Sequence, residues 1–185
     1  LTDHGAHQLD ILQWALGKDD TGPVAVENIK GDIDLNDPVL NTAGQYSFEV
    51  VYADGIRVHV SSSLPYGVHI FGEDNKQVTT SIGRCITNPP ELYRTKLKDT
   101  DTHLYVSGQQ EKNFIDCIFN GQKTISPVEV GHHSIALAHI ANIGMRLGIA
   151  NLKWDSVKEC FTNSDEANKL IDRPLLNGWK LDPWA

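Results

Sequence analysis

The chain opens with an amphipathic pattern that predicts a helix over residues 5–16. Leucines recur at helical spacing and form one apolar stripe. The stripe consists of Leu9, Leu12 and Leu16. Thr2 and Asp3 both suit the N-cap of such a helix, and Gly17 is the residue type that commonly ends one. We therefore expect a helix that packs through its leucines.

The middle of the chain alternates with a period of two, which predicts β-strands. The expected strands cover residues 24–32, 45–52, 56–61, 68–71 and 77–82. In the second of them, one side carries Tyr46, Phe48, Val50 and Tyr52, and the other carries Gln45, Ser47 and Glu49. Short connections, such as the hairpin signal Ala53-Asp54-Gly55, predict antiparallel neighbours. Alternation leaves open whether helices or another subunit cover the apolar side.

Helical patterns return in the last third of the chain. Residues 109–119 and the longer segment 128–147 are predicted helices, which Gly121 and Gly148 end. The expectation for the remainder is a loop at 85–102, a short strand at 153–155 and a last helical turn or two at 165–171. The predicted class is α+β: one domain, residues 1–185, with an open, mainly antiparallel β-sheet and helices packed on one face.

Composition narrows the classes of partner. The net charge is −8 and the isoelectric point is about 5.4, which argues against a nucleic acid or an anionic membrane as partner. The three cysteines form no C-x-x-C pair, so we expect reduced, mostly buried thiols without a disulfide framework or a zinc site. No apolar run approaches the roughly 18 residues of a membrane span.

The first helix also carries candidate chemistry. Asp3, His7, Asp10 and Trp14 are spaced by four, three and four residues and share one helix face. A carboxylate that holds one imidazole nitrogen leaves the other free to exchange a proton with a substrate, as general acid–base catalysis requires. The alternative is a capping Asp3, a half-exposed His7 and a solvated Asp10. A metal site is disfavoured here, since no Cys lies near in sequence.

A second group of histidines lies on the long predicted helix. His132 and His133 lie just inside its start, and His139 shares a face with His132. The pair at the helix start can contact a substrate, or can instead satisfy buried carbonyl groups or face solvent. Spacing alone does not decide between these roles.

Together these segments resemble one family of oxidoreductases. The opening D-H-G-A-H-Q-L-D-I-L-Q-W resembles the D-x-G-x-H-x-x-D-x-x-x-W element that begins the C-terminal domain of the Gfo/Idh/MocA family. Further along, four segments resemble the ending of a bacterial subgroup of that family: F-I-D-C-I-F-N-G-Q-K, V-E-V-G-H-H-S-I-A-L-A-H-I-A-N-I-G-M-R-L-G, L-K-W-D and D-E-A-N-K-L-I-D-R-P. The matches run from residue 2 to residue 174 in the family's order.

The resemblance implies a two-domain, NAD(P)-dependent dehydrogenase. Its N-terminal Rossmann domain would bind NAD or NADP and supply a catalytic lysine from a Glu-Lys-Pro element. This sequence has no G-x-G-x-x-G after a strand and no E-K-P, so we expect the dinucleotide-binding domain to be absent from this chain, which would bind no cofactor and be inactive alone. The chain would be the substrate-binding and oligomerisation domain, with its sheet face forming a homo-oligomer.

By similarity, His7 matches the family's acid–base histidine and Asp3 the acidic residue one turn before it. Oxidation of a sugar, polyol or related carbinol is implied, in which His7 takes the hydroxyl proton while hydride passes to the nicotinamide. Asp10 would orient His7, and Trp14, His132 and His133 are candidates for contact with the substrate. Two alternatives stay open: an NAD-dependent glycosidase of the same family, and a non-catalytic module that dimerises through its sheet or binds sugar.

Two features of the termini bear on these expectations. The subgroup often ends R-P-x-R-x-P-W, whereas residues 173–179 here read R-P-L-L-N-G-W and lack the second arginine. The chain begins at Leu1 without an initiator methionine, which we interpret as a piece of a longer, soluble protein. Its compartment, cytoplasmic or exported, is left open because a targeting segment would precede Leu1.

Overall fold

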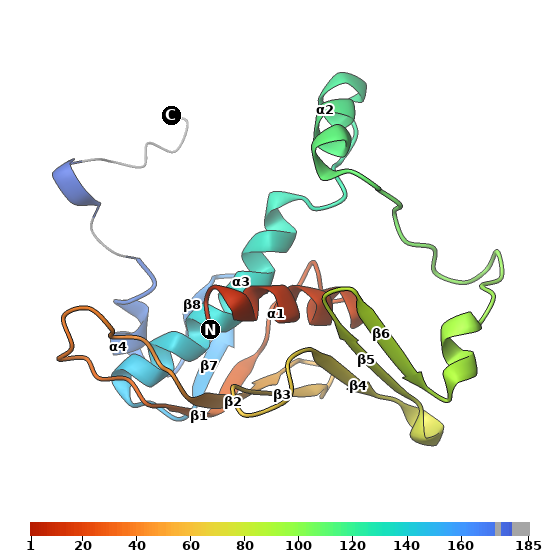
Figure 1. The fold of residues 1–185 in the computed structure, drawn as a ribbon. Coiled ribbons are helices and arrows are strands. Elements are labelled where there is room, and N and C mark those ends of the chain that lie inside the picture. Colours follow the sequence, from red (N-terminus) through yellow and green to blue (C-terminus); the bar gives the residue numbers. More distant parts are fainter. Residues whose placement is uncertain (173–174, 179–185) are drawn as a thin grey trace. The chain divides into compact units, whose positions relative to one another are not determined.

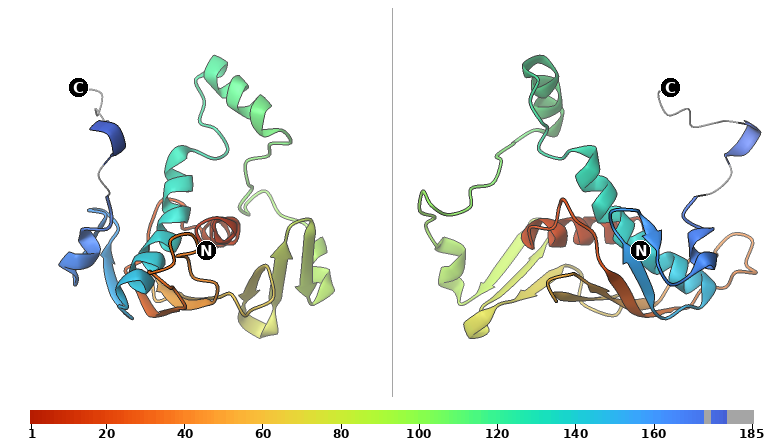
Figure 2. Two further views of the ribbon diagram at one scale, coloured as in Figure 1. Left: turned by 60° about the vertical axis from the view of Figure 1, so that its left-hand side comes forward. Right: turned by 180° about the vertical axis from the view of Figure 1, so that it is seen from behind.

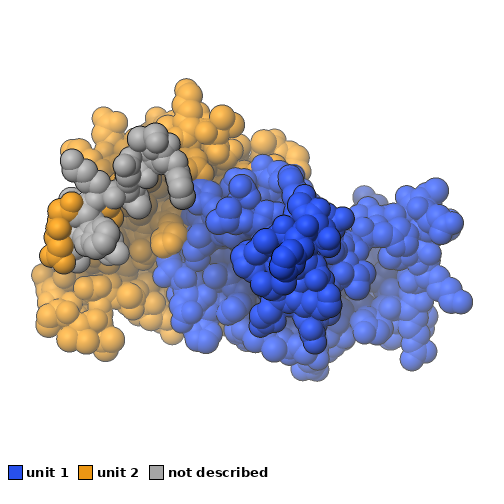
Figure 3. Space-filling model, turned by 90° about the horizontal axis from the view of Figure 1, so that it is seen from above, with its two compact units in different colours: residues 1–20, 65–138 blue, residues 21–64, 139–185 orange. Residues whose placement is uncertain are grey.

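A computed structural model describes residues 1–172 and 175–178 and confirms the α+β class. Antiparallel strands and helices divide between two compact units, coloured separately in Figure 3. The first unit comprises residues 1–20 and 65–138, and the second comprises residues 21–64 and 139–185. The departure from the family's ending is at Leu176, where the pattern has its second arginine, and the flanking Arg173, Pro174 and Trp179 lie outside the described residues.

The second unit is built on a five-stranded antiparallel sheet with the order β3-β2-β1-β7-β8 (Figure 1). Its strands are β1 (Ala25–Gly31), β2 (Tyr46–Val51), β3 (Arg57–Ser61), β7 (Leu152–Asp155) and β8 (Cys160–Phe161). The hairpin between β2 and β3 pairs Val50 with Val58, as the turn signal predicts. The two-residue strand β8 is too short to produce a pattern in the sequence.

Alternation in β2 separates a buried face from a polar one. Phe48 and Val50 are fully buried, and Tyr52 just beyond the strand is nearly so. On the opposite face the Arg57 side chain donates hydrogen bonds of 2.6 Å to both Glu27 and Glu49, which links three strands. The apolar face is therefore the covered one, and the outer face of the sheet is polar.

Helix α3 (Val128–Leu147) covers that apolar face with its C-terminal half. A Cβ atom on Gly144 would lie 2.5 Å from Cδ1 of Ile29, and one on Gly31 would lie 2.6 Å from Sδ of Met145. Helix and strand β1 approach so closely that a side chain at either position would force a neighbouring group to move. In this half of α3, Ile140, Ala141, Ile143 and Met145 are buried, whereas most of the first turn of the helix is exposed, so the expected burial holds only for part of the helix.

The first unit contains a three-stranded antiparallel sheet, two complete helices and the first half of α3. The strands are β4 (Val68–Phe71), β5 (Gln77–Ser81) and β6 (Arg84–Asn88), and the helices are α1 (His4–Ala15) and α2 (Gln110–Asn120). Helix α1 contacts β4 (Figure 2). Among the described residues β3 and β4 do not pair, so the antiparallel pairing that their short connection predicts is wrong there.

Residues 85–102 are not the continuous loop that the sequence predicts. They contain β6 and the 3-10 helix η2 (Pro90–Arg94), and a second 3-10 helix, η1 (Glu73–Asn75), precedes β5. Gly83, at φ +68°, turns the chain, and Cys85-Ile86-Thr87 then pairs with β5. The prolines at 89 and 90 suggested a loop, but they lie after the pairing segment and only end it.

The predicted helices α2 and α3 are confirmed close to their expected bounds. Gly121 and Gly148 follow α2 and α3 at φ +63° and +66°, the left-handed conformation that ends a helix. Helix α4 (Asp165–Asn168) is shorter than expected and is capped by Ser164, whose hydroxyl accepts from the Ala167 amide at 3.2 Å. The short 3-10 helix η3 (Leu176–Gly178) follows.

All three cysteines are free thiols, of which Cys117 is buried, Cys160 is half-buried and Cys85 is exposed.

Candidate functional site

Helix α1 presents the predicted polar face to solvent. Leu9, Leu12 and Gln13 are buried, whereas the four candidate residues on the opposite face, Asp3, His7, Asp10 and Trp14, are exposed. The amide of Ala6 donates to the Asp3 carbonyl at 3.0 Å, but the Asp3 side chain makes no capping bond. The Asp3 carboxylate therefore does not cap the helix, as it would in the alternative interpretation that the sequence left open.

His7 has no hydrogen bond and no ion pair with any described residue. The nearest charged partner of Asp3 is instead His4, at 3.8 Å between Oδ2 and Nε2, and both of these side chains are almost fully exposed. An ion pair of this kind contributes little to stability. The structure thus places Asp3, His7 and Asp10 on one exposed face but shows no contact between His7 and either carboxylate.

Asp10 is held by a residue distant in sequence. The hydroxyl of Ser134 on α3 donates a hydrogen bond of 2.8 Å to Oδ1 of Asp10 on α1. Ser134 is 3% exposed, so its hydroxyl is fixed within packed side chains. This bond fixes one oxygen of the carboxylate and leaves the other able to accept a further hydrogen bond.

The histidine pair on α3 lies next to this contact. Nδ1 of His133 is 2.7 Å from the carbonyl oxygen of Asp19, in the segment that follows α1. The rings of His132 and His133 have centroids 5.8 Å apart and are tilted by 55°. Asp10, Asp19, His133 and Ser134 therefore join α1, the segment after it and the start of α3 within the first unit.

Asp19 is a component of this cluster that sequence reasoning missed. Its Oδ1 atom is buried and has no hydrogen-bond partner among the described residues. Burial raises the pKa of the Asp19 carboxyl, and the negative charges of Asp10 and Asp20 raise it further. One signal was available in the sequence, because two adjacent acidic residues directly after a helix lie where the helix dipole disfavours negative charge.

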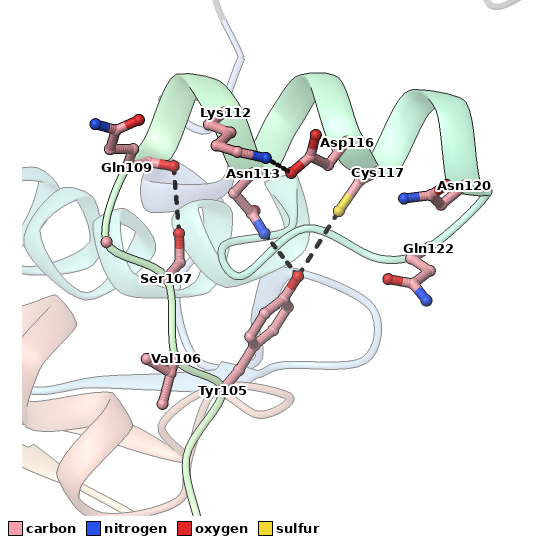
Figure 4. Close-up of a pocket in the computed structure, with 11 residues that line it drawn as sticks. Tyr105, Val106, Ser107, Gln109, Lys112, Asn113, Asp116, Cys117, Asn120 and Gln122 are labelled. Atoms are coloured by element: carbon pink, nitrogen blue, oxygen red, sulfur yellow. Dashed lines mark hydrogen bonds and ion pairs between the residues drawn. The ribbon is translucent and has the colours of Figure 1, made fainter.

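A depression in the surface does not coincide with the candidate residues. A depression of about 530 Å³ lies elsewhere in the first unit, along α2 and the segments on either side of it (Figure 4). There the hydroxyl of Tyr105 accepts a hydrogen bond of 2.6 Å from Asn113, whose side-chain oxygen accepts from the amide of Ile125 at 3.0 Å. No candidate residue from the sequence lines this depression, and these bonds tie loops to α2.

Metal binding and membrane insertion are two further possibilities for the described part of the chain. No three His, Cys, Asp or Glu side chains are grouped there in a way that could hold a metal ion. None of its helices combines the length and the apolar character needed to cross a membrane.

Comparison with known proteins gives a family match. Residues 1–181 match the model described as "Oxidoreductase family, C-terminal alpha/beta domain", of the Gfo/Idh/MocA type. A search of curated proteins found no match. One similar solved structure is that of an aldose-aldose oxidoreductase from Caulobacter crescentus complexed with glycerol, with 15% identity and a TM-score of 0.46. The match covers 80% of this chain and 45% of that one, so this chain spans less than half of that protein's length.

Proposed function

The chain belongs to the Gfo/Idh/MocA oxidoreductase family, as its C-terminal α/β domain, and we propose that it is the substrate-binding domain of a dehydrogenase. The proposed substrate is a sugar, a polyol or a related carbinol, and the proposed cofactor is NAD or NADP. One observation carries this proposal: the exposed face of α1 offers His7, free of described partners, beside the anchored carboxylate of Asp10.

His7 is proposed as the acid–base residue. Oxidation of a hydroxyl carbon requires a base that removes the hydroxyl proton, and an imidazole exchanges protons near neutral pH. Because neither ring nitrogen of His7 is bonded within the described part of the chain, the ring can turn either nitrogen toward a substrate. We propose that Asp3 and Asp10 stabilise the cation that forms when His7 accepts the proton.

The other candidates would bind and orient the substrate. Trp14 is 52% exposed on the same face of α1 and offers a flat apolar surface to the C–H side of a sugar ring. His132 and His133, at the start of α3, offer polar atoms to its hydroxyl groups. An apolar wall with a few fixed polar groups is the usual composition of a small-ligand site.

The residues of this chain do not fit a dinucleotide. A pyrophosphate is usually bound by a glycine-rich turn between a strand and a helix, and the sequence contains no such fingerprint. We propose that a separate Rossmann domain of the same protein holds NAD or NADP. The chain would then contribute only the substrate and acid–base side of the site, and would be inactive by itself.

We propose that the protein is a homo-oligomer that associates through the outer face of the five-stranded sheet. That face carries the Glu27–Arg57–Glu49 bridge, so an interface there would be polar rather than apolar. Size-exclusion chromatography with light scattering tests this proposal, and a monomer at micromolar concentration would contradict it.

The activity is tested on the whole protein with NAD or NADP and a panel of sugars and polyols, by following nicotinamide absorbance. Replacing His7 with Asn should lower turnover about 10²- to 10⁴-fold, the usual contribution of a positioned acid–base group. His103→Asn is the matched control, because His103 is exposed in a loop outside the site, and it should retain full activity.

Three outcomes decide between the candidate functions. A normal rate for His7→Asn would remove His7 from the mechanism. Release of nitrophenol from a nitrophenyl glycoside without net change in cofactor would identify a glycosidase instead. Absence of both activities would leave a binding or assembly module.

A further inference from the structure

The ring of His133 is held differently from the rings of His69 and His103. A backbone carbonyl can only accept a hydrogen bond, so the 2.7 Å contact with the Asp19 oxygen requires a proton on Nδ1 of His133. The neutral ring then carries its lone pair on Nε2. No described residue bonds to that second nitrogen, and the side chain is half-buried, so part of it reaches solvent.

His69 shows the opposite arrangement in the same unit. Its Nε2 donates to the carbonyl of Pro65 at 3.4 Å, and its Nδ1 accepts from the hydroxyl of Thr79 at 3.2 Å. Both nitrogens of His69 are thus used inside the protein. His103 also directs Nε2 to a carbonyl, that of Lys98, at 2.9 Å. Among these three rings only His133 keeps Nε2 available as an acceptor.

The surroundings of His133 are those of the candidate site. The next residue, Ser134, holds Asp10 on α1, and Asp10 lies three residues after His7. A substrate hydroxyl that loses its water on binding to this face needs a hydrogen-bond acceptor, because a desolvated hydroxyl without a partner carries a free-energy penalty. A hydrogen bond to one imidazole nitrogen fixes the tautomer, and the protein thereby presents the other nitrogen in a defined protonation state.

We propose that His133 is the residue that recognises a substrate hydroxyl, with Nε2 accepting its hydrogen bond while Asp19 fixes Nδ1. The proposal rests on the proposed function and deepens it, since it selects one histidine, one nitrogen and one protonation state. The ligand class is a compound with at least two hydroxyl groups: one reacts at His7 and another is bound at His133.

The tautomer is tested by NMR on the chain labelled with ¹⁵N-histidine, at a pH where the imidazoles are neutral. Two-bond correlations between ring protons and nitrogens show which nitrogen carries the proton. Loss of one set of signals in His133→Asn assigns the ring. We expect the Nδ1–H form for His133 and the Nε2–H form for His69 in the same spectrum. An Nε2–H form at His133 would overturn the proposal.

The binding role is tested by kinetics of the whole protein with the polyol that it oxidises. Asn at position 133 keeps an N–H donor near the place of Nδ1, and so can still bond to Asp19, but it has no atom in place of Nε2. We expect His133→Asn to raise KM roughly fivefold to tenfold with kcat changed less than about twofold, which is the effect of losing one neutral hydrogen bond. The matched control is His139→Asn, an exposed position on the same helix.

These results separate the binding role from an anchoring role. An unchanged KM in His133→Asn would show that the imidazole only anchors the segment after α1, and it would overturn the proposal. If the whole protein oxidises no sugar or polyol, the proposed function fails. D-glucose, myo-inositol and glycerol are then titrated into the labelled whole protein: a shift of the His133 Nε2 signal would uphold hydroxyl recognition, and no shift would refute it.

Discussion

A methyl group added at Gly144 should destabilise the protein, whereas the same change at Gly131 in the same helix should not. A Cβ atom at position 144 would lie 2.5 Å from Cδ1 of Ile29, 3.0 Å from the carbonyl oxygen of Ile149 and 3.2 Å from Cδ1 of Leu152. The Ile29 side chain can move, but the backbone oxygen cannot move without distorting the end of α3. At Gly131 a Cβ atom would meet nothing within 4 Å.

Both substitutions gain the higher helix propensity of alanine, but only Gly144→Ala also overpacks the core. Alanine in a helix interior is about 1 kcal/mol more favourable than glycine. Overpacking a core position costs about 1–3 kcal/mol, and three contacts this short at Gly144 place it near the upper end. Gly131→Ala should therefore raise the free energy of unfolding by up to about 1 kcal/mol, and Gly144→Ala should lower it by about 1–2 kcal/mol.

Thermal unfolding followed by circular dichroism tests this pair of variants. A difference of about 2–3 kcal/mol between the variants corresponds to a gap in Tm of roughly 4–12 °C for a protein of this size. Equal stabilisation by both alanines would refute the close approach of α3 to β1.

Two further predictions concern the cluster around Asp10. Burial and like charges raise the pKa of Asp19, so its ionisation opposes folding at neutral pH, and Asp19→Asn should stabilise the protein at pH 7. The gain should shrink as the pH falls through the raised pKa and vanish below the ordinary value of 3.8, which urea unfolding at several pH values would show; a gain that persists in acid would contradict the electrostatic cause. Ser134→Ala should release Asp10 and lower stability by about 0.5–1.5 kcal/mol, with a fall in kcat/KM of the whole protein that Ser134→Thr, which keeps a hydroxyl, largely restores. Equal kcat/KM in the Ala and Thr variants would show that the bond to Asp10 does not serve the reaction.

The helices could be predicted because their signals are local. Gly121 and Gly148 end α2 and α3 in the left-handed conformation that glycine adopts without a steric penalty, and the sequence shows both residues directly. The buried side of β2 was likewise visible as an alternation of aromatic and branched side chains. Which layer covers it was not visible, because the contact of Gly144 with Ile29 joins positions far apart in sequence.

Strand β6, in contrast, was not predicted from the sequence. Its pairing with β5 depends on a tight turn at Gly83, while two prolines nearby gave a stronger local signal for a loop. Proline prevents pairing only where its own missing N–H is needed, and here the pairing ends at Asn88, before the first proline. Position relative to the paired residues therefore matters more than the presence of proline in the segment.

The candidate site likewise has features that the sequence predicts and features that it does not. Helical periodicity suffices to place Asp3, His7, Asp10 and Trp14 on one exposed face, since it needs only the 3.6-residue repeat. The same periodicity suggested that Asp10 would orient His7, but the described partner of Asp10 is Ser134, 124 residues away. A side chain on an exposed face can reach several partners, and tertiary packing selects among them. The single serine hydroxyl that α3 brings to α1 therefore decides which oxygen of Asp10 is already bonded, and no spacing within the first helix encodes that choice.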